Sequence, residues 1–230
     1  MSAQRLREAR EDAHREAAPF AIVDLVALLL LAFLSHQNDW ELLGTEAWWL
    51  WLLVALPVLA LAVRFAVGIG NLERESGRAF SIWLLQALGL GNAFGVFALI
   101  ASLTGIGGGS QPSGGQLLAS GSVVLLTNVV TFAFAFWELD LGGPVARALA
   151  DDRKAPDFEF PQDDNPDVAR PAWEPRLWDY AYVALTNATA FSPTDVMPLT
   201  RRAKLVMAIE STVSIITVLV IAARAVNVLK

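Results

Sequence analysis

Apolar residues gather in blocks of about the length that a helix needs to cross a lipid bilayer, roughly 20 residues. Four blocks come before the acidic region of the chain and a fifth lies near its end, at residues 20–35, 47–67, 82–104, 117–137 and 203–223. Lipid offers no water to backbone groups, so spans of this length are predicted to be helices. The pattern predicts an all-α, polytopic membrane helix bundle with about five spans.

Composition supports this class. The chain has 230 residues, of which 55% are hydrophobic, and its mean hydropathy is +0.47, too apolar for a soluble domain of this size. Cysteine is absent, which excludes disulfides and thiolate metal sites. The sequence contains no nucleophile elbow, P-loop, zincin or dinucleotide-binding motif. We therefore expect no catalytic residues, no metal and no cofactor.

Two polar segments flank the first four apolar blocks, one before them and one after them. Residues 1–18 carry helix-forming residues and charge pairs such as Arg7 with Glu11; we expect a solvated cytoplasmic amphiphilic helix, with binding to lipid headgroups as the alternative. Residues 139–176 form an acidic, proline-rich connector that we expect to be extended and solvated. The alternative is that it concentrates cations near a pore mouth. Residues 19–138 would form a four-span bundle, and 177–230 a separate C-terminal unit.

The basic residues predict an orientation. If five spans alternate across the membrane, 15 of the 17 Lys and Arg residues fall on the N-terminal side. The loops between spans one and two and between spans three and four contain none. By the positive-inside rule, the N-terminus is cytoplasmic, in the cell membrane.

The segment 177–191 is apolar and aromatic but only 15 residues long, too short to cross comfortably and too apolar for a loop. It is followed by a turn rich in side-chain oxygens, Ser192, Thr194 and Asp195. We predict a re-entrant half-helix that leads into the last span.

This tail resembles the two-helix pore domain of potassium-type channels, in which an aromatic, threonine-rich pore helix leads through a filter to the inner helix. The matched positions include Thr189, Asp195, Pro198 and Thr200, and Glu210 has a counterpart in the inner helix. The resemblance covers about 55 residues and implies an ion path lined by Thr189, Ser192, Thr194, Asp195 and Glu210.

The filter itself departs from that family. Ser192 and Thr194 replace its two glycines, and Pro193 stands between them. A carbonyl cage needs backbone conformations that glycine adopts and proline cannot, so potassium selectivity of that kind is not expected. Charge also places the turn on the cytoplasmic side, whereas a potassium-type loop enters from outside. A full crossing of 177–195, giving six spans, is the open alternative.

The chain as a whole is also similar to an uncharacterised family of bacterial multi-pass membrane proteins. The shared elements are Phe158, Phe160 and Pro161, the segment 179–182, the serine/threonine-Asp turn and a final Ala-Val-Asn. This resemblance implies the membrane architecture and no particular activity.

Polar groups inside predicted spans are functional candidates because each costs insertion energy. The ionisable ones are Asp24, Arg64, Glu210 and Arg224. Glu210 is the strongest, either in a pathway or as a structural partner of Arg64 or Arg224. Asn92 and Asn128 are expected to hydrogen-bond between helices.

Two weaker patterns complete the sequence. Span three contains Gly89, Gly91 and Gly95, a stripe of small residues that permits close helix approach. Asn187 matches a glycosylation acceptor, which we interpret as incidental.

Two hypotheses of function follow. In the first, the C-terminal unit forms a cation channel or permeation path that is not potassium-selective. In the second, the chain is a non-conducting membrane scaffold or assembly protein whose acidic connector recruits a partner. The expected partners are the lipid bilayer, monovalent cations and further copies of the chain, and no nucleic acid is expected because the net charge is −6.

Overall fold

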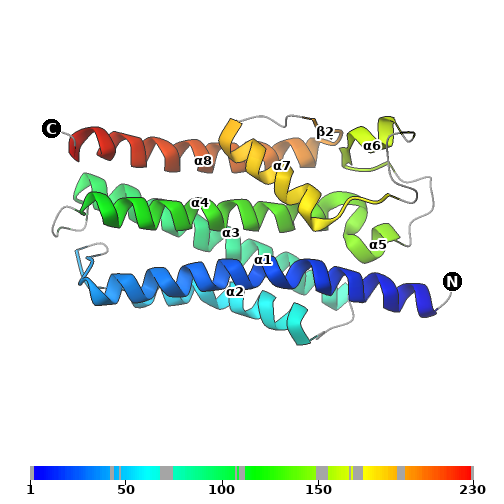
Figure 1. Cartoon of the computed structure of the whole chain (residues 1–230), viewed down its shortest axis with the longest axis horizontal. Coiled ribbons are helices and arrows are strands. Elements are labelled where there is room, and N and C mark those ends of the chain that lie inside the picture. The colour runs from blue at the N-terminus through cyan, green and yellow to red at the C-terminus, as the bar shows by residue number, and fades with distance from the viewer. Residues whose placement is uncertain are drawn as a thin grey trace.

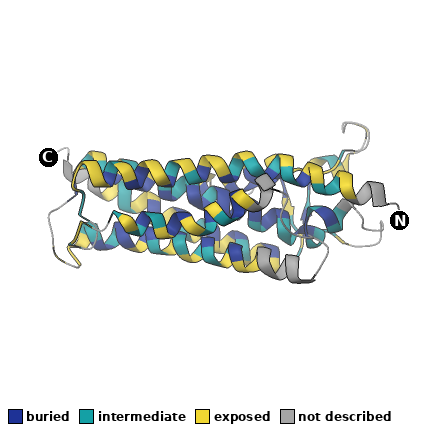
Figure 2. Ribbon diagram, turned by 90° about the horizontal axis from the view of Figure 1, so that it is seen from below, coloured by how far each residue is buried: buried dark blue, intermediate teal, exposed yellow. Residues whose placement is uncertain are grey.

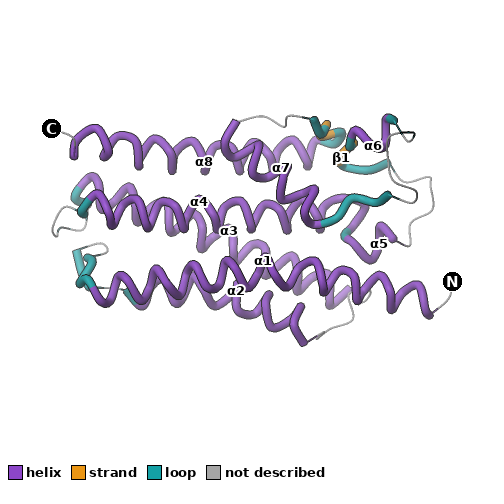
Figure 3. Tube along the Cα trace, viewed as in Figure 1, coloured by secondary structure: helices purple, strands orange, loops and turns teal. Residues whose placement is uncertain are grey.

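The computed structural model describes residues 3–41, 44–46, 48–67, 75–106, 108, 112–148, 155–165, 167, 173–190 and 195–228. At 3–6, 64–67, 75–81 and 224–228 only the backbone is described. Long helices lie side by side along one axis (Figure 1), and helix makes up nearly all of the described chain outside the connector (Figure 3). The all-α prediction is confirmed.

The first four long helices run alternately up and down the bundle (Figure 1). They are α1 (Ala3–Gln37), α2 (Trp49–Val67), α3 (Glu75–Thr104) and α4 (Gly114–Leu139). The last long helix, α8 (Arg201–Val228), brings the chain to the end opposite the N-terminus (Figure 1). Helix α4 contacts α1, α3, α7 and α8, so it forms the centre of the bundle.

Helix α1 joins the expected cytoplasmic segment and the first span into one helix of 35 residues. Pro19 lies inside it, where its missing N–H removes one backbone hydrogen bond without ending the helix. Ala13 and Ala17 are buried, because their small side chains let this helix approach its neighbours closely. One side of the segment expected to be solvated is therefore packed.

Two glycines of the stripe in α3 lie where neighbouring helices come close. A Cβ on Gly91 would stand 3.1 Å from a Val54 methyl on α2, and one on Gly95 would stand 2.9 Å from a Val124 methyl on α4. Gly89 faces open space. The expected close approach is confirmed at two of the three positions.

The acidic connector folds onto one end of the bundle instead of extending into solvent. It contains a 3-10 turn η1 (Asp140–Gly142), α5 (Pro144–Ala148), strand β1 (Phe158–Glu159) and α6 (Pro161–Asp164). Strand β1 pairs antiparallel with β2 (Met197–Pro198), in the register Phe158 with Pro198 and Glu159 with Met197. Phe158 and Phe160 are buried, and removal of their apolar rings from water favours packing of the connector against the bundle. The prediction of a wholly solvated connector is wrong.

The bundle carries apolar side chains on its outside and a set of polar side chains within. Figure 2 shows exposed positions repeating along the outer faces of the helices. Large apolar residues are among them, such as Val26, Phe33, Leu56, Leu90 and Leu219. Four described stretches are long and apolar enough to cross a membrane, at Arg7–Gln37, Ile82–Thr104, Gly114–Arg147 and Arg201–Ala223, and Trp49–Val63 is a shorter apolar one.

Candidate functional site

Helix α7 (Leu177–Ala190) enters the bundle from the connector end and stops partway along α8 (Figure 1). Its 14 residues rise about 21 Å, short of the roughly 30 Å hydrocarbon core of a bilayer. Strand β2, which precedes α8, lies at the end of the bundle from which α7 enters (Figure 1). Carboxylate side chains accept hydrogen bonds from free backbone N–H groups at the start of α7. Asp179 accepts the N–H of Arg176 at 2.7 Å, and Glu16 accepts the N–H of Leu177 at 3.0 Å.

The inner end of α7 meets α8 at a buried carboxyl group. Glu210 is 0% exposed and Asn187 is 2% exposed. The Asn187 amide donates to Oε2 of Glu210 at 2.7 Å and to the carbonyl of Met207 at 2.9 Å. Ser211 donates to Oδ1 of Asn187 at 3.0 Å, which orients that amide. We call Glu210, Asn187 and Ser211 the carboxyl–amide cluster.

A second polar group links three helices through one side chain. Asn128 on α4 accepts a hydrogen bond from the Asn92 amide on α3 and donates at 2.7 Å to the hydroxyl of Ser214 on α8. All three residues are buried. Ser214 lies one turn beyond Glu210 on α8, about 6 Å along the axis, so the two polar groups are neighbours.

A third polar group joins α1 to α4. The hydroxyl of Thr127 donates to Oδ1 of Asp24 at 2.8 Å, and both residues are buried. Thr127 precedes Asn128 on α4, so the contacts of α1 and α8 with this helix lie at one level. Buried polar side chains therefore form a belt across the bundle.

Some oxygens in this belt have no hydrogen-bond partner within the described part of the chain. They are Oε1 of Glu210, Oδ2 of Asp24, Oδ1 of Asn92 and the hydroxyl oxygen of Thr131. A buried polar atom without a partner costs roughly 1–3 kcal/mol. Uptake of a proton by Glu210 or Asp24 removes the further and larger cost of a buried negative charge.

The residues predicted for an ion path do not come together as one described cluster. Thr189 is exposed, and its hydroxyl donates to the carbonyl of Leu185 in its own helix at 2.7 Å. It follows Asn187 by two positions and therefore lies about 200° around α7 from it. Asp195 is exposed at the connector end. Ser192 and Thr194 lie outside the described residues, as do the side chains of Arg64 and Arg224. Glu210 is the predicted path residue that the structure places in the interior.

Asn187 is the main residue that sequence reasoning missed, because its glycosylation pattern suggested an incidental role. A signal was present. Tyr180, Val183, Ala184 and Asn187 fall on one face of a helix, and all four are buried. Asn187 continues an apolar stripe and was therefore directed toward the interior.

The connector contributes a further buried ionic group at the end of α4. Oδ1 of Asp140 accepts the N–H of Asp157 at 2.7 Å, and Oδ2 accepts the hydroxyl of Tyr180 and lies 3.5 Å from Arg147. Arg147 also donates to the Tyr180 hydroxyl at 2.9 Å. This group ties the connector to the first turns of α7.

Asp157 forms the second connection of the connector. The guanidinium of Arg202, on the first turn of α8, donates to both carboxylate oxygens of Asp157, at 2.7 and 2.6 Å. The hydroxyl of Thr200 donates a further hydrogen bond to Asp157. Burial raises the pKa of the Asp157 carboxyl, but the hydrogen bonds and charge of Arg202 and the bond from Thr200 outweigh it, so the net pKa lies below its usual value. Among the described residues, no group of three or more His, Cys, Asp or Glu side chains is arranged to hold a metal ion.

Comparison with known proteins adds no relative. No family model, curated protein or solved structure matches the chain.

Proposed function

We propose that this chain is a multi-pass protein of the cell membrane with its N-terminus in the cytoplasm. We propose further that it conducts cations, chiefly protons, by way of Glu210. The observation that carries the proposal is the Glu210 carboxyl, fully buried between α7 and α8, with Asn187 on one oxygen and no described partner on the other.

Membrane location is supported by the distribution of side chains. Large apolar groups cover the outside of the described helices while Asp24, Asn128 and Glu210 lie inside. A protein folded in water has the opposite distribution, because exposed apolar surface is costly in water and buried polar groups are costly in a core. Described basic residues such as Arg10 on α1, Arg147 on α5 and Arg202 at the start of α8 belong to elements at the end where the N-terminus lies (Figure 1), which supports a cytoplasmic N-terminus.

The half-length of α7 supports a path that begins at the connector end. A helix that stops partway across leaves its inner end, with Asn187, at membrane depth. An ionisable residue at that depth costs roughly 2.5–3.5 kcal/mol on insertion scales, so its presence favours a function. Glu210 is such a residue, and its described hydrogen-bond partner is an amide, which carries no charge.

The proton is the cation that the carboxyl–amide cluster fits best. A sodium or potassium ion needs several oxygen ligands, whereas one carboxyl oxygen without a described partner is enough to take up a proton. Ser214 and Asn128, one turn further along, and Asp24 with Thr127 beyond them, extend the polar belt across the bundle.

The experiment measures proton flux in liposomes that contain the purified protein and a pH-sensitive dye, with a pH gradient or an imposed membrane potential. Glu210→Gln keeps the shape and removes the titratable group, so we expect a fall in flux of about a hundredfold. Asn187→Ala should shift the pH at which flux is half-maximal, because the carboxylate loses its donor. Asp167→Asn, at an exposed carboxyl, is the matched control and should leave flux unchanged.

Asp195→Ala reports separately on whether the turn predicted from the sequence belongs to the path. Reduced flux places the turn on the path, and unchanged flux removes it. Absence of flux in the wild type under both gradients would reject the proposal. Normal flux in Glu210→Gln, with the variant eluting as a folded protein, would reject the site.

The scaffold hypothesis has one observation of its own. The Asn92, Asn128 and Ser214 group joins three helices, as expected of side chains that only hold a bundle together. This alternative predicts no flux in the wild type, together with a loss of stability when Asn128 is replaced.

A further inference from the structure

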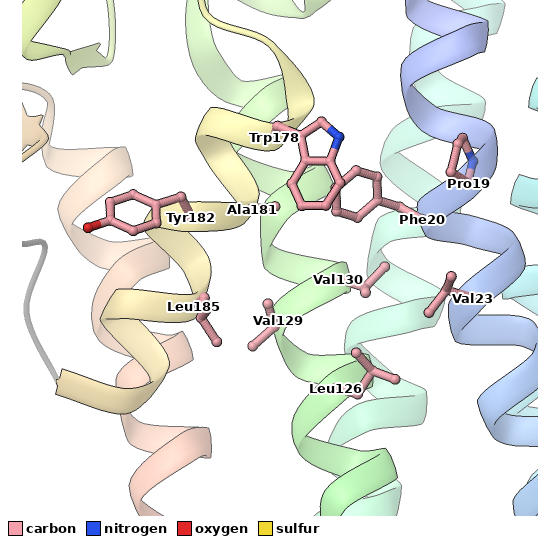
Figure 4. A pocket seen from close by; sticks show the side chains of 10 residues that line it. All are labelled: Pro19, Phe20, Val23, Leu126, Val129, Val130, Trp178, Ala181, Tyr182 and Leu185. Carbon is pink, nitrogen blue, oxygen red and sulfur yellow. The ribbon is translucent and has the colours of Figure 1, made fainter.

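An apolar groove of about 370 Å³ runs between α1, α4 and α7, within the roughly 300–1,000 Å³ range of small-molecule pockets. Figure 4 shows α4 as its floor, with Phe20 and Val23 of α1 on one side and Trp178 and Leu185 of α7 on the other. Trp178 is 71% exposed, and its ring meets Phe20 edge-on at 4.8 Å between centroids. The groove presents almost only hydrocarbon and aromatic surface.

A smaller polar pocket of about 130 Å³ lies toward the connector end of the same helices. Its charged residues are Asp12 and Glu16 from α1, Arg147 from α5, and Glu174 and Arg176 from the segment before α7. Arg147 is already paired with Asp140. Arg176 lies 3.6 Å from Glu16 and is mostly exposed.

The two hollows lie next to each other along α1 and the start of α7. Glu16 and Phe20 are one turn apart on α1, and Arg176 and Trp178 are two residues apart. The N–H of Leu177, between them, donates to Glu16 at 3.0 Å. A molecule with an apolar tail in the groove would therefore carry its polar end into the charged pocket.

The charges of the pocket restrict that polar end. The pocket has three carboxylates, and Arg176 is the guanidinium that Asp140 does not neutralise. A purely anionic group would be repelled. A zwitterion is complementary: its phosphate pairs with the guanidinium of Arg176, and its ammonium donates to Asp12, Glu16 or Glu174.

We propose that the groove and pocket together bind one aminophospholipid, with an acyl chain between α1 and α7 and the phosphoethanolamine headgroup against Arg176 and the carboxylates. A primary ammonium fits better than a quaternary one, because carboxylates need N–H donors and a quaternary amine is held by an aromatic cage. The inference rests on the membrane location in the proposed function and not on the proton path.

The test uses the full chain in nanodiscs, ejected for native mass spectrometry, with phosphatidylethanolamine, phosphatidylcholine and phosphatidylglycerol as probes. The wild type should retain one phosphatidylethanolamine and lose the other two. Arg176→Ala should weaken retention about tenfold, as expected for one charge-assisted contact. Trp178→Ala should weaken it comparably by opening the groove.

Two matched controls separate the site from general effects. Trp83→Ala removes a tryptophan that is 70% exposed on α3, and Arg201→Ala removes an exposed arginine at the start of α8; neither should change retention. Equal retention of the three lipids, or equal effects of Trp178→Ala and Trp83→Ala, would overturn the proposal. So would a second copy of the chain or another protein in the groove, seen as a dimer or complex that Trp178→Ala abolishes.

These outcomes are distinct from failure of the proposed function. A chain that does not enter nanodiscs contradicts membrane location itself. A chain that enters, retains phosphatidylethanolamine and carries no protons leaves the lipid site intact and rejects the path.

Discussion

At the scale of the residue, the bundle depends on amides that act as donor and acceptor at once. Asn128 uses both ends of its side chain, accepting from Asn92 and donating to Ser214. Asn187 does the same, donating to Glu210 while accepting from Ser211. An amide placed at a junction of helices can therefore satisfy two neighbours that are polar and buried.

Replacing Asn128 tests this role. Asn128→Ala leaves the Asn92 amide and the Ser214 hydroxyl without their partner, so we expect a loss of about 1–2 kcal/mol in the free energy of unfolding. Unfolding in bicelles or mild detergent, followed by circular dichroism, measures it. Asn38→Ala is the control, because Asn38 is exposed and its amide donates to the carbonyl of Leu34 in the same segment; an equal loss in both variants would contradict the interhelical role.

At the scale of the element, the connector joins the ends of the long helices through Asp140 and Asp157, and we call these two residues and their hydrogen-bond partners the clasp. Asp140 at the end of α4 holds the backbone of 157–158 and the hydroxyl of Tyr180 in α7. Asp157 in turn holds Arg202 at the start of α8. The clasp fixes where α7 enters and where α8 begins, and hence how Asn187 meets Glu210.

The half-helix could be predicted from the sequence and the clasp could not. A short apolar run with a polar turn is a local pattern, so 177–191 was recognisable as α7. Asp140 and Asp157 looked like members of a solvated acidic run, because their partners Tyr180 and Arg202 lie 40 and 45 positions away. No local pattern distinguishes a buried aspartate from an exposed one.

The clasp should weaken in acid. The folded pKa of Asp157 is lowered, so its stabilising contribution is fully present above the usual aspartate pKa of about 3.9 and is lost as pH falls through the folded value. Asp157→Asn should cost about 1–3 kcal/mol at neutral pH and should flatten the acid limb of the stability curve. Thermal unfolding from pH 7 to pH 3 measures it, and Asp167→Asn is the control; an unchanged acid limb would be inconsistent with the clasp.

At the scale of the whole molecule, strand β2, the next labelled element after α7, lies toward the same end of the bundle as the N-terminus, and the C-terminus lies at the other (Figure 1). The five-span arrangement, in which α7 returns without crossing, stays a prediction, and a full crossing of 177–195 is its alternative. The side of the membrane on which each end lies belongs to the proposed function.

Cysteine labelling tests this topology directly, because the natural chain has no cysteine. Asp195→Cys, in the turn after α7, and Glu46→Cys, between α1 and α2, are both at exposed positions. A membrane-impermeant maleimide added to intact cells should label Glu46→Cys and leave Asp195→Cys unlabelled until the cells are opened. A reporter fused after Lys230 should read as non-cytoplasmic, and labelling of both cysteines from outside would contradict the arrangement.

The amino-acid pattern alone was enough for the helices, their approximate ends, the half-length of α7 and the candidate status of Glu210, because the length of an apolar run and a charge inside it are local properties. Only the packed structure decided that Asn187 and not Thr189 accompanies Glu210, that Asn128 joins three helices, and that the acidic connector is partly buried. A side chain's partner depends on which face of its helix meets which neighbour. That choice is made between segments far apart in the chain.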